Sequence, residues 1–404
     1  MSDMNKPVIL YFIRAEADLE RIVSMSVPGK NYADQHFAYY GDISVIFEQG
    51  IKNTFQKYLL DSDGFKVLDV VTLFHVGKLY KAIKKIEAKN KVVRIIIELV
   101  LKILYKLIYI KQDKLANKLL KKIKPSFLIT DNSEERENYF PHILRQVAKK
   151  KGVKVQVVTH GPAGGFHKDY YSYEPIKPQP YDQFNVGICS IYDIGFGMPN
   201  YTLTGDPSDS FPYVMYKNKL EYDEIIFLNE RKYKIGFFMA APFETCTNAW
   251  AIMEEIILDY AFCKDVAMVA KFHPRLYKFG EYPYLLKIDN LKLFGSELDR
   301  SRLVKWADIV VCSDHCSTLF EPMILGKKVV AVHTKKVRPF AKFKSPIHDC
   351  DPSMNSIHHS GEFNLDNLKA YTSDTSFIDT YCWGGLGKID LGEKIIKELI
   401  TNHD

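Results

Sequence analysis

The sequence is poor in cysteine and tryptophan, and it has no long apolar run that is free of charged residues. Seven cysteines in 404 residues are an odd number at low density, so we expect free thiols in a reducing compartment rather than a disulfide framework. Hydrophobic residues make up 47% of the chain and charged residues 26%, close to the averages for soluble globular proteins. These values argue against disorder and a collagen-like chain, and the length suits two domains.

The most apolar stretch, residues 92–110, reads VVRIIIELVLKILYKLIYI and has the length of a membrane span. Arg94, Glu98, Lys102 and Lys106 follow one another at intervals of four residues, which places their charges on one stripe of a helix. Charges in the middle of a span are costly, so the pattern predicts an amphipathic helix instead. The amino-terminal segment lacks the cleavage site of a signal peptide, and we expect a cytoplasmic protein.

Positive charge is concentrated in a predicted helical stretch, residues 78–124. This stretch has fifteen Lys and Arg against three Asp and Glu, a net charge of +12, whereas the whole chain has +6 and the remainder therefore −6. Such a basic amphipathic surface suits the anionic cytoplasmic face of an inner membrane, with the protein held there peripherally. The alternative is a solvated helix face that packs on its sheet. Nucleic acid is not an expected partner, because no nucleic-acid-reading motif accompanies the lysines.

Short, nearly continuous apolar runs alternate with helix-length segments in both halves of the chain. This pattern is typical of buried parallel strands, and its repetition predicts an α/β protein of two Rossmann-like domains. The expected strands are Val8–Ile13, Ser44–Phe47, Val67–Leu73, Phe127–Thr130, Val153–Val158, Ile235–Ala240, Val266–Phe272, Leu291–Phe294, Ile309–Cys312 and Lys328–Val332.

A polar stretch that contains Pro207 and Pro212 interrupts the alternation before a clear strand restarts near Lys234. We therefore expect an N-terminal domain over residues 1–215 and a C-terminal domain over residues 216–385. An amphipathic helix is expected within residues 386–404, and it could cross back to the first domain.

The second expected domain carries the strongest local signal, where the strand that ends near Lys271 runs into His273, Pro274 and Arg275. Ligands of open α/β sheets bind outside the carboxyl ends of strands. His273 could therefore present a ring nitrogen to a phosphate, with Lys271 and Arg275 adding positive charge. The alternative is a histidine that only makes a structural hydrogen bond at a strand end.

A strand, turn, helix and strand are predicted over residues 306–332. Ser317 and Thr318 stand where the helix should begin, and hydroxyl and free N–H groups at a helix start can bind an anion. Glu321 follows Thr318 by three residues, so two interpretations stay open: a capping box, or a nucleotide phosphate on Ser317 and Thr318 with a ribose hydroxyl on Glu321. Gly326 is expected to end the helix.

The motifs Lys-x-His-Pro and Asp-Ile-Val-Val-x-Ser-Asp-x-x-Ser-Thr-Leu-x-Glu-Pro resemble the C-terminal half of GT-B glycosyltransferases that build bacterial surface polysaccharides. The nearest groups are CDP-glycerol glycerophosphotransferases, bacterial sialyl- and polysialyltransferases, and Kdo transferases. Val157-Val-Thr-His160-Gly161 and Thr202-Leu-Thr-Gly205-Asp-Pro207 resemble elements of their first domain. The resemblance covers pieces of residues 127–335 and none of residues 1–125.

The resemblance implies a GT-B fold, with a cleft between two Rossmann-like domains and a nucleotide-sugar donor. It implies that residues 1–215 form the acceptor domain and residues 216–385 the nucleotide-sugar domain. It implies that His273, Ser317 and Thr318 contact the donor phosphate and that Glu321 lies near the ribose. It associates the His-Pro and Ser-Thr pairs with cytidine donors. GT-B enzymes usually hold the leaving phosphate with protein groups, so we expect no metal and no cofactor beyond the donor.

The candidates for the catalytic base or nucleophile are His160, Asp131 and Glu244, because each follows an expected strand. The glycerophosphotransferases are proposed to use a His at the position of His160, whereas the sialyltransferases use a carboxylate of the first domain. Gly161 and Gly164 would let a substrate approach the backbone closely, and an ordinary turn is the alternative.

Two short motifs could suggest a metal but do not predict one. Cys312, His315 and Cys316 lack a second pair of zinc ligands, and Asp349-Cys-Asp351 does not follow a suitable strand.

The motifs and the family resemblance together predict a transferase that moves a sugar, with Kdo or another 2-keto acid sugar from a CMP donor as the first choice. The acceptor would be a glycan or lipid-linked glycan of capsule, O-antigen or lipopolysaccharide synthesis.

Three alternatives remain open for the function. The first is a transferase of glycerol phosphate or another polyol phosphate from a CDP donor. The second is a non-hydrolysing UDP-sugar 2-epimerase on the same fold. The third is an inactive scaffold of a glycan-assembly complex.

Overall fold

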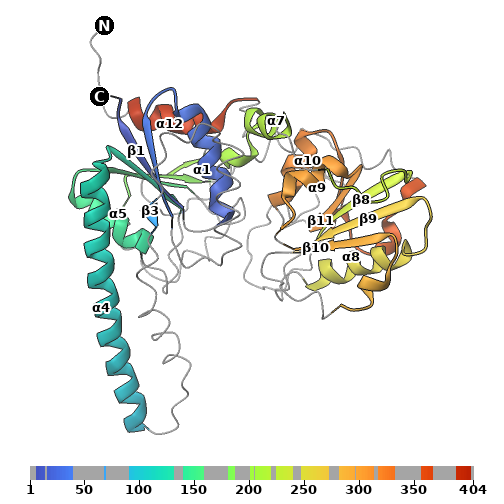
Figure 1. Ribbon diagram of the computed structural model, residues 1–404, viewed down its shortest axis with the longest axis horizontal. Helices are drawn as coiled ribbons and strands as arrows, with labels where there is room; N and C mark the ends of the chain where they lie inside the picture. Colours follow the sequence, from blue (N-terminus) through green and yellow to red (C-terminus); the bar gives the residue numbers. More distant parts are fainter. Residues whose placement is uncertain are drawn as a thin grey trace.

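The computed structural model describes most of two α/β domains, which Figure 1 shows side by side. The described residues are 6–13, 16–39, 68–69, 91–131, 140–158, 181–186, 201–203, 205–219, 224–239, 247–272, 282–295, 297–313, 317–332, 356–366 and 388–401.

The first domain is built on a sheet whose seven described strands are all parallel, in the order β3-β2-β1-β4-β5-β6-β7. The strands are β1 (Val8–Ile13), β2 (Asp34–Tyr39), β3 (Leu68–Asp69), β4 (Phe127–Asp131), β5 (Lys154–Val158), β6 (Gln183–Val186) and β7 (Tyr201–Leu203).

Both faces of the first sheet are covered, which explains why its central strands are apolar along their whole length. Successive side chains of a strand point to opposite faces. Leu10 and Phe12 of β1 accordingly pack with α5 (Phe140–Lys150) and the carboxyl-terminal half of α4 (Lys91–Ile123). Ile9, Tyr11 and Ile13 pack instead with α1 (Glu16–Gly29) and α12 (Leu391–Thr401).

The second domain contains a sheet whose six described strands are also all parallel, in the order β10-β9-β8-β11-β12-β13. The strands are β8 (Tyr233–Phe238), β9 (Val266–Lys271), β10 (Leu291–Phe294), β11 (Ile309–Ser313), β12 (Lys328–Val332) and β13 (Ser356–Ile357). The helical elements are α8 (Thr247–Asp259), η6 (Leu285–Lys287), α9 (Arg300–Trp306), η7 (Ser317–Leu319), α10 (Phe320–Ile324) and η8 (Ser360–Glu362). The two parallel sheets confirm the predicted α/β fold class.

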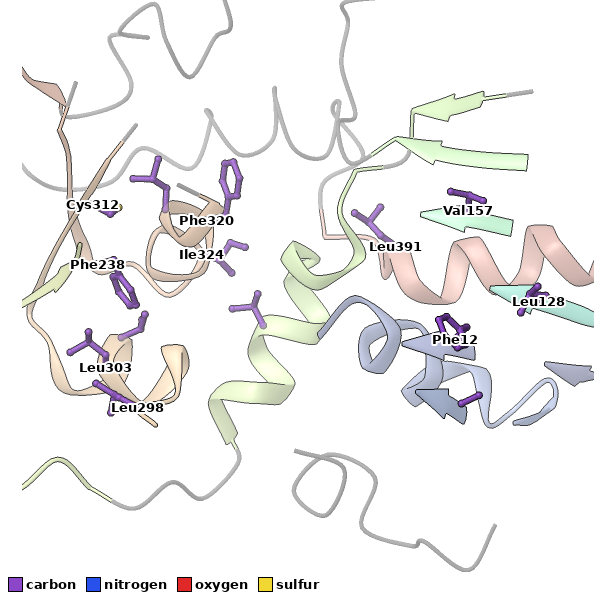
Figure 2. Packing of buried hydrophobic residues seen from close by; sticks show 14 of the residues in the cluster. Phe12, Leu128, Val157, Phe238, Leu298, Leu303, Cys312, Phe320, Ile324 and Leu391 are labelled. Atoms are coloured by element: carbon purple, nitrogen blue, oxygen red, sulfur yellow. The ribbon is translucent and has the colours of Figure 1, made fainter. Parts of the chain in front are cut away.

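A connecting segment lies between the domains, with the short helix η4 (Pro207–Asp209) and α7 (Phe211–Lys219). One hydrophobic cluster includes residues of both sheets together with Val214 of α7. In Figure 2 its labelled members form two groups on either side of a helix, with Phe238 and Phe320 in one group and Phe12 and Leu128 in the other. The domains therefore share part of their buried apolar surface.

The carboxyl-terminal helix α12 lies on the first domain, although the strands that precede it in the chain belong to the second (Figure 1). Its close approach to α1 depends on Gly392, because a Cβ atom at that position would lie 2.2 Å from the carbonyl oxygen of Ser24. The domain boundaries after residues 215 and 385 stay predictions; the last strand of the first sheet ends at Leu203, and the first strand of the second begins at Tyr233.

The helix α4 extends away from the first domain, with its amino-terminal end farthest from the sheet (Figure 1). Its 33 residues give it a length of about 50 Å. None of the helices among the described residues has both the length and the apolar character needed to span a bilayer.

Most expected strands were placed correctly within two residues, and four strands of two to six residues were missed. The missed strands are β2, β6, β7 and β13. β2 begins with Asp34, Gln35 and His36, so its sequence lacks the apolar run that identified the others. The expected strand Ser44–Phe47 lies outside the described residues, and of Val67–Leu73 only Leu68–Asp69 are described.

Candidate functional site: two sheet edges and a buried charge cluster between them

Each sheet has a point where the strand order changes direction. The first runs outward from β1 to β2 and β3 on one side and from β4 onward on the other, and the second does the same from β8 and β11. In sheets of this kind the ligand site lies outside the carboxyl ends of the strands at that reversal. The relevant ends are those of β1 and β4 in the first domain and of β8 and β11 in the second.

At the second-domain reversal, the chain leaves β11 at Ser313 and resumes as a helical segment at Ser317. The segment begins as η7 and continues as α10, so Ser317 and Thr318 occupy its first turn, as expected. The residue at the N-cap of α10 is Leu319, and no side-chain hydrogen bond caps the helix there. The alternative in which Thr318 is the N-cap of a capping box is therefore wrong for α10. Gly326 lies just past the helix with a φ of 68°, which confirms the predicted stop.

Next to this reversal, Lys271 is the last residue of β9. Its ammonium group donates a hydrogen bond of 2.8 Å to the carbonyl of Gly295, which follows β10. Lys271 therefore lies at the carboxyl edge of the sheet, where it was expected. Its predicted contact with a donor phosphate stays a prediction.

At the first-domain reversal, β4 ends at Asp131, one of the predicted bases. The preceding Thr130 accepts a hydrogen bond of 3.3 Å from the guanidinium of Arg145, which lies on α5 and is 1% exposed. A buried cation thus lies beside the carboxyl end of β4. Sequence reasoning missed Arg145, although a lone Arg among the apolar residues of a short helix is a usable signal.

Most of the predicted site residues lie outside the described part of the chain. These are His160, Gly161, Gly164, Glu244, His273, Pro274 and Arg275. Asp131 and Ser317 are described as members of their elements, without side-chain placement. His315, Cys316 and the Asp349–Asp351 motif also fall outside, and the described residues contain no group of three metal-ligand side chains. Cys263 and Cys312 are free thiols.

A buried group of charged side chains joins the two domains, and we call it the interdomain charge cluster. It draws on α1, the connecting segment, α9 and α10, and all but two of its members, Glu20 and Arg300, are less than 9% exposed. Its members are Glu20, Arg21, Asp206, Asp209, Lys217, Arg300 and Glu321.

Glu321, the predicted ribose contact, lies at the centre of one half of this cluster. Its Oε2 atom lies 2.9 Å from the ammonium nitrogen of Lys217 and 2.8 Å from Nε of Arg300. Lys217, which has no exposed side-chain surface, also lies 3.6 Å from Glu20 of α1, and Arg300 forms an ion pair with the same Glu20. Two cations therefore connect a carboxylate of the second domain to one of the first.

These contacts set the protonation of Glu321. Burial alone would raise the pKa of its carboxyl group, but the positive charges of Lys217 and Arg300 outweigh burial and lower that pKa to about 2. Glu321 is 1% exposed and is ionised at neutral pH. A capping-box role would direct this carboxylate at its own helix start, whereas the structure directs it at α7 and α9. The ribose contact stays a prediction.

The other half of the cluster is centred on Asp206, within the Thr-Gly-Asp-Pro element noted in the sequence. Its carboxylate accepts a hydrogen bond of 2.6 Å from Arg21 and two more from Ser208, through the backbone N–H at 2.9 Å and the hydroxyl at 2.7 Å. The Ser208 bonds cap η4 and fix the start of the connecting segment.

Asp209 completes the charge balance. Burial and the charge of Asp206 raise the pKa of Asp209 well above its ordinary value, so this carboxyl holds its proton more tightly than an exposed one. Apart from Asp209, the cluster contains three cations and three carboxylates. Such balance is what allows charges to be buried at all.

The comparisons with known proteins bear on the fold. The sequence matches no protein-family model, and no curated protein matches it significantly. Solved structures do resemble it over nearly its whole length. The UDP-GlcNAc 2-epimerase from Neisseria meningitidis, bound to UDP-GlcNAc, has a TM-score of 0.59 at 12% identity, over 98% of this chain and 100% of that one.

Two further structures show the same likeness. The UDP-GlcNAc 2-epimerase from Methanocaldococcus jannaschii has a TM-score of 0.56 at 12% identity, over 98% of this chain and 99% of that one. The glycotransferase of kitacinnamycin has a TM-score of 0.51 at 10% identity, over 98% and 99%.

The chain has a GT-B fold. Its two parallel sheets and these likenesses show this architecture, as the motifs implied. Likeness at 10 to 12% identity carries the fold alone and does not distinguish a Kdo transferase or sialyltransferase from other GT-B proteins.

Proposed function

We propose that the chain is a nucleotide-sugar-dependent glycosyltransferase of bacterial surface glycan synthesis. The observation that carries this proposal is the placement of the motif residues on a GT-B fold. Lys271 ends β9, and Ser317 and Thr318 begin the helical segment after β11, so these residues flank the strand-order reversal of the second domain. Similar structures with bound UDP-GlcNAc and UDP support a nucleotide sugar as ligand class.

The preferred donor is a CMP-activated 2-keto acid sugar, Kdo or a sialic acid. Its single phosphate would be held by His273, with Lys271 and Arg275 adding charge and the hydroxyls of Ser317 and Thr318 donating hydrogen bonds. These groups would stabilise the negative charge that builds on the phosphate as the sugar departs, which is the role that a metal has in other transferases. We therefore propose no metal requirement, and activity should persist in EDTA.

The transfer needs a base for the acceptor hydroxyl. The candidates remain His160, Asp131 and Glu244. Asp131 is the last residue of β4, and each of the other two follows an expected strand. The base takes the hydroxyl proton, the acceptor oxygen bonds to the anomeric carbon, and the bond from that carbon to the CMP phosphate breaks. The acceptor proposed is a glycan or lipid-linked glycan at the cytoplasmic face of the inner membrane.

A second candidate is a non-hydrolysing UDP-GlcNAc 2-epimerase. The observation that favours it is that several of the similar structures are UDP-GlcNAc 2-epimerases. An epimerase acts on a soluble nucleotide sugar and needs neither a glycan acceptor nor a membrane-facing surface. Transfer of a polyol phosphate from a CDP donor, and an inactive scaffold, remain as further alternatives.

A thermal-shift series with CMP, CDP, UDP and UDP-GlcNAc tests the proposal, because a ligand that binds the folded state raises the unfolding temperature. We expect CMP to give the largest increase. His273→Ala should abolish the CMP response, whereas His358→Ala, an exposed histidine of the same domain, should leave it unchanged. A response to uridine nucleotides alone would contradict the cytidine donor.

Product analysis then separates the two activities. Incubation with CMP-Kdo or CMP-sialic acid and a synthetic glycan acceptor should release CMP and extend the acceptor. Conversion of UDP-GlcNAc to its 2-epimer, without any acceptor, would instead establish the second candidate. If no nucleotide binds at all, the scaffold alternative gains and the enzyme proposal fails.

A further inference from the structure

The distal half of α4 carries a stripe of exposed apolar side chains, which we call the α4 apolar stripe. Its members follow one another at alternating intervals of four and three residues, so they lie along one side of the helix. They are Ile96, Val100, Ile103, Leu107 and Ile110, with 54%, 37%, 60%, 48% and 41% of their surface exposed.

This stripe is not an extension of the face that packs on the first domain. In the proximal half of α4 the buried residues are Gln112, Ala116, Leu119 and Leu120. At about 100° per residue, these positions lie roughly half a turn around the helix from the stripe. None of the five stripe residues belongs to a hydrophobic cluster of the described residues, and a solvated helix face would not require apolar side chains at these positions.

The stripe continues into a row of lysines on the same side. Lys114, Lys118 and Lys121 extend the four-and-three spacing from Ile110, and all three are exposed. The helix as a whole has nine Lys and Arg against two Asp and Glu, and its acidic residues, Glu98 and Asp113, lie off this side. One side of α4 thus combines an apolar segment with a purely cationic one.

We propose that this side of α4 docks on an anionic lipid bilayer. The apolar stripe would enter the boundary between headgroups and acyl chains, with the helix lying in the plane of the surface. Lys114, Lys118 and Lys121 would then lie at the level of the headgroups, where each cation near an anionic surface adds to binding. The helix extends away from the first domain (Figure 1), and the side chains of the stripe and of the three lysines are exposed.

A second copy of the chain is the other occupant that the spacing suits, because intervals of four and three residues also build coiled coils. The lysine row argues against it. In a parallel pair, Lys114, Lys118 and Lys121 of the two copies would face one another in the seam, where like charges repel. Charge complementarity therefore favours the lipid surface.

This inference deepens the proposed function, because it names the residues that would hold the protein at the membrane. Its evidence, however, comes from α4 alone. Nucleotide binding and vesicle binding are separate measurements. A chain that binds vesicles without binding any nucleotide would refute the transferase and leave the docking intact. A chain that binds a nucleotide without binding vesicles would refute the docking and leave the transferase intact.

Flotation of the full chain with lipid vesicles tests the docking. We expect association with vesicles that contain about one third phosphatidylglycerol in phosphatidylcholine, weak association with phosphatidylcholine alone, and loss of binding as salt rises. Equal binding to the two kinds of vesicle, or no binding to either, would overturn the proposal.

Two sets of variants locate the contact. Changing Lys114, Lys118 and Lys121 together to Gln should lower partitioning onto anionic vesicles on the order of 100-fold. The matched control changes three exposed lysines of the second domain, Lys232, Lys264 and Lys287, to Gln and should have little effect.

The apolar set changes Ile96, Ile103 and Leu107 to Ser and should also abolish flotation. Its control changes three exposed apolar residues on or next to the second domain to Ser. They are Ile226, Phe262 and Leu286, which are 82%, 96% and 61% exposed. Equal loss in a control set would overturn the assignment to α4. Light scattering could instead show a stable dimer that does not bind vesicles and that the apolar set dissociates. This result would establish the stripe as an interface between two copies of the chain.

Discussion

The interdomain charge cluster and the outward side of α4 use charged and apolar side chains in opposite ways. In the cluster, cations and carboxylates are largely removed from water and contact one another; Lys217 and Glu321, for example, are 2.9 Å apart. On α4, lysines stand in water without acidic neighbours on their side, and large apolar side chains are 37% to 60% exposed beside them. The charged groups of the cluster have their partners within the chain. The apolar side chains and lysines of α4 would find theirs on a surface outside it.

The two regions also differ in how they are assembled. The cluster joins residues that are distant in sequence, with 185 positions between Arg21 and Asp206 and 280 between Glu20 and Arg300. The α4 stripe and its lysines come from one continuous helix. Breaking the cluster should therefore affect folding and the relation of the domains, while breaking the stripe should affect only what the protein contacts.

The largest effect is expected from Lys217→Ala. This change leaves Glu321 buried with one cation instead of two, and removing one partner of a buried ion pair costs about 3–5 kcal/mol. The free energy of unfolding, measured by denaturant titration, should fall by that amount. Lys219→Ala, an exposed lysine of the same helix, should change it by less than about 0.5 kcal/mol. Equal stability of the two variants would show that the cluster is not a stabilising contact.

Acid should weaken the cluster through Glu321. Its folded pKa of about 2 lies below its ordinary value of 4.5, so its contribution is complete above pH 4.5 and is lost as the pH falls toward 2. We expect the stability difference between the wild type and Glu321→Gln to be on the order of 3 kcal/mol at pH 6 and to shrink below pH 4.5.

The comparison with Glu321→Gln is needed because Asp209 acts in the other direction. Its raised folded pKa means that its burial favours the folded state at low pH and costs stability as the pH rises through that pKa. Subtracting the two pH profiles removes this contribution. A difference that does not depend on pH between 6 and 3 would contradict the ionised, paired state of Glu321.

A smaller effect is expected from Gly392→Ala. The added Cβ would lie 2.2 Å from the carbonyl oxygen of Ser24, so α12 must move away from α1, at a cost of about 1–3 kcal/mol. Because α1 supplies Glu20 and Arg21 to the cluster, hydrogen exchange of α1 should increase with that of α12. Gly326→Ala is not a suitable control, because the φ of 68° at that position would strain an alanine. The control is Leu391→Ile, a conservative change at the neighbouring position.

The smallest effect on stability is expected on α4. Ile103→Ser and Leu107→Ser together should leave the free energy of unfolding within about 0.5 kcal/mol of wild type, because both side chains are already largely exposed. The same double variant should lose binding to anionic vesicles. A large loss of stability would mean that the stripe packs against protein, and the contrast with the cluster would disappear.

The sequence patterns located the fold and the edges of the site. The strands β1, β10 and β12 were predicted to the residue. β1 and β12 are buried at all but their first residue, and strands buried on both faces form apolar runs that are visible without a structure. Lys271, Ser317 and Gly326 lie where their motifs placed them, since each belongs to a local strand end or helix end. β2 was missed because it begins with the polar residues Asp34, Gln35 and His36, although it pairs with a strand on each side.

The partners of Glu321 could not be predicted in the same way. The helix that ends in Lys217-Asn-Lys219 gives no local reason why one lysine should be fully buried and the other exposed. That difference arises because α7 lies between α1 and α10, so Lys217 meets Glu20 and Glu321 from two other parts of the chain. Short-range patterns report propensity and periodicity, but not which distant element a face will meet.

The sequence by itself determined the two α/β domains, the positions of several motif residues at strand or helix ends, and the long basic helix over residues 91–123. Each of these follows from interactions between neighbours a few residues apart. Only the tertiary structure decided that Glu321 pairs with Lys217 and Arg300, that α12 returns to the first domain, and that the stripe of α4 faces away from it. The physical reason is that burial of a charge or an apolar face depends on contacts between segments far apart in the chain, which no local pattern encodes.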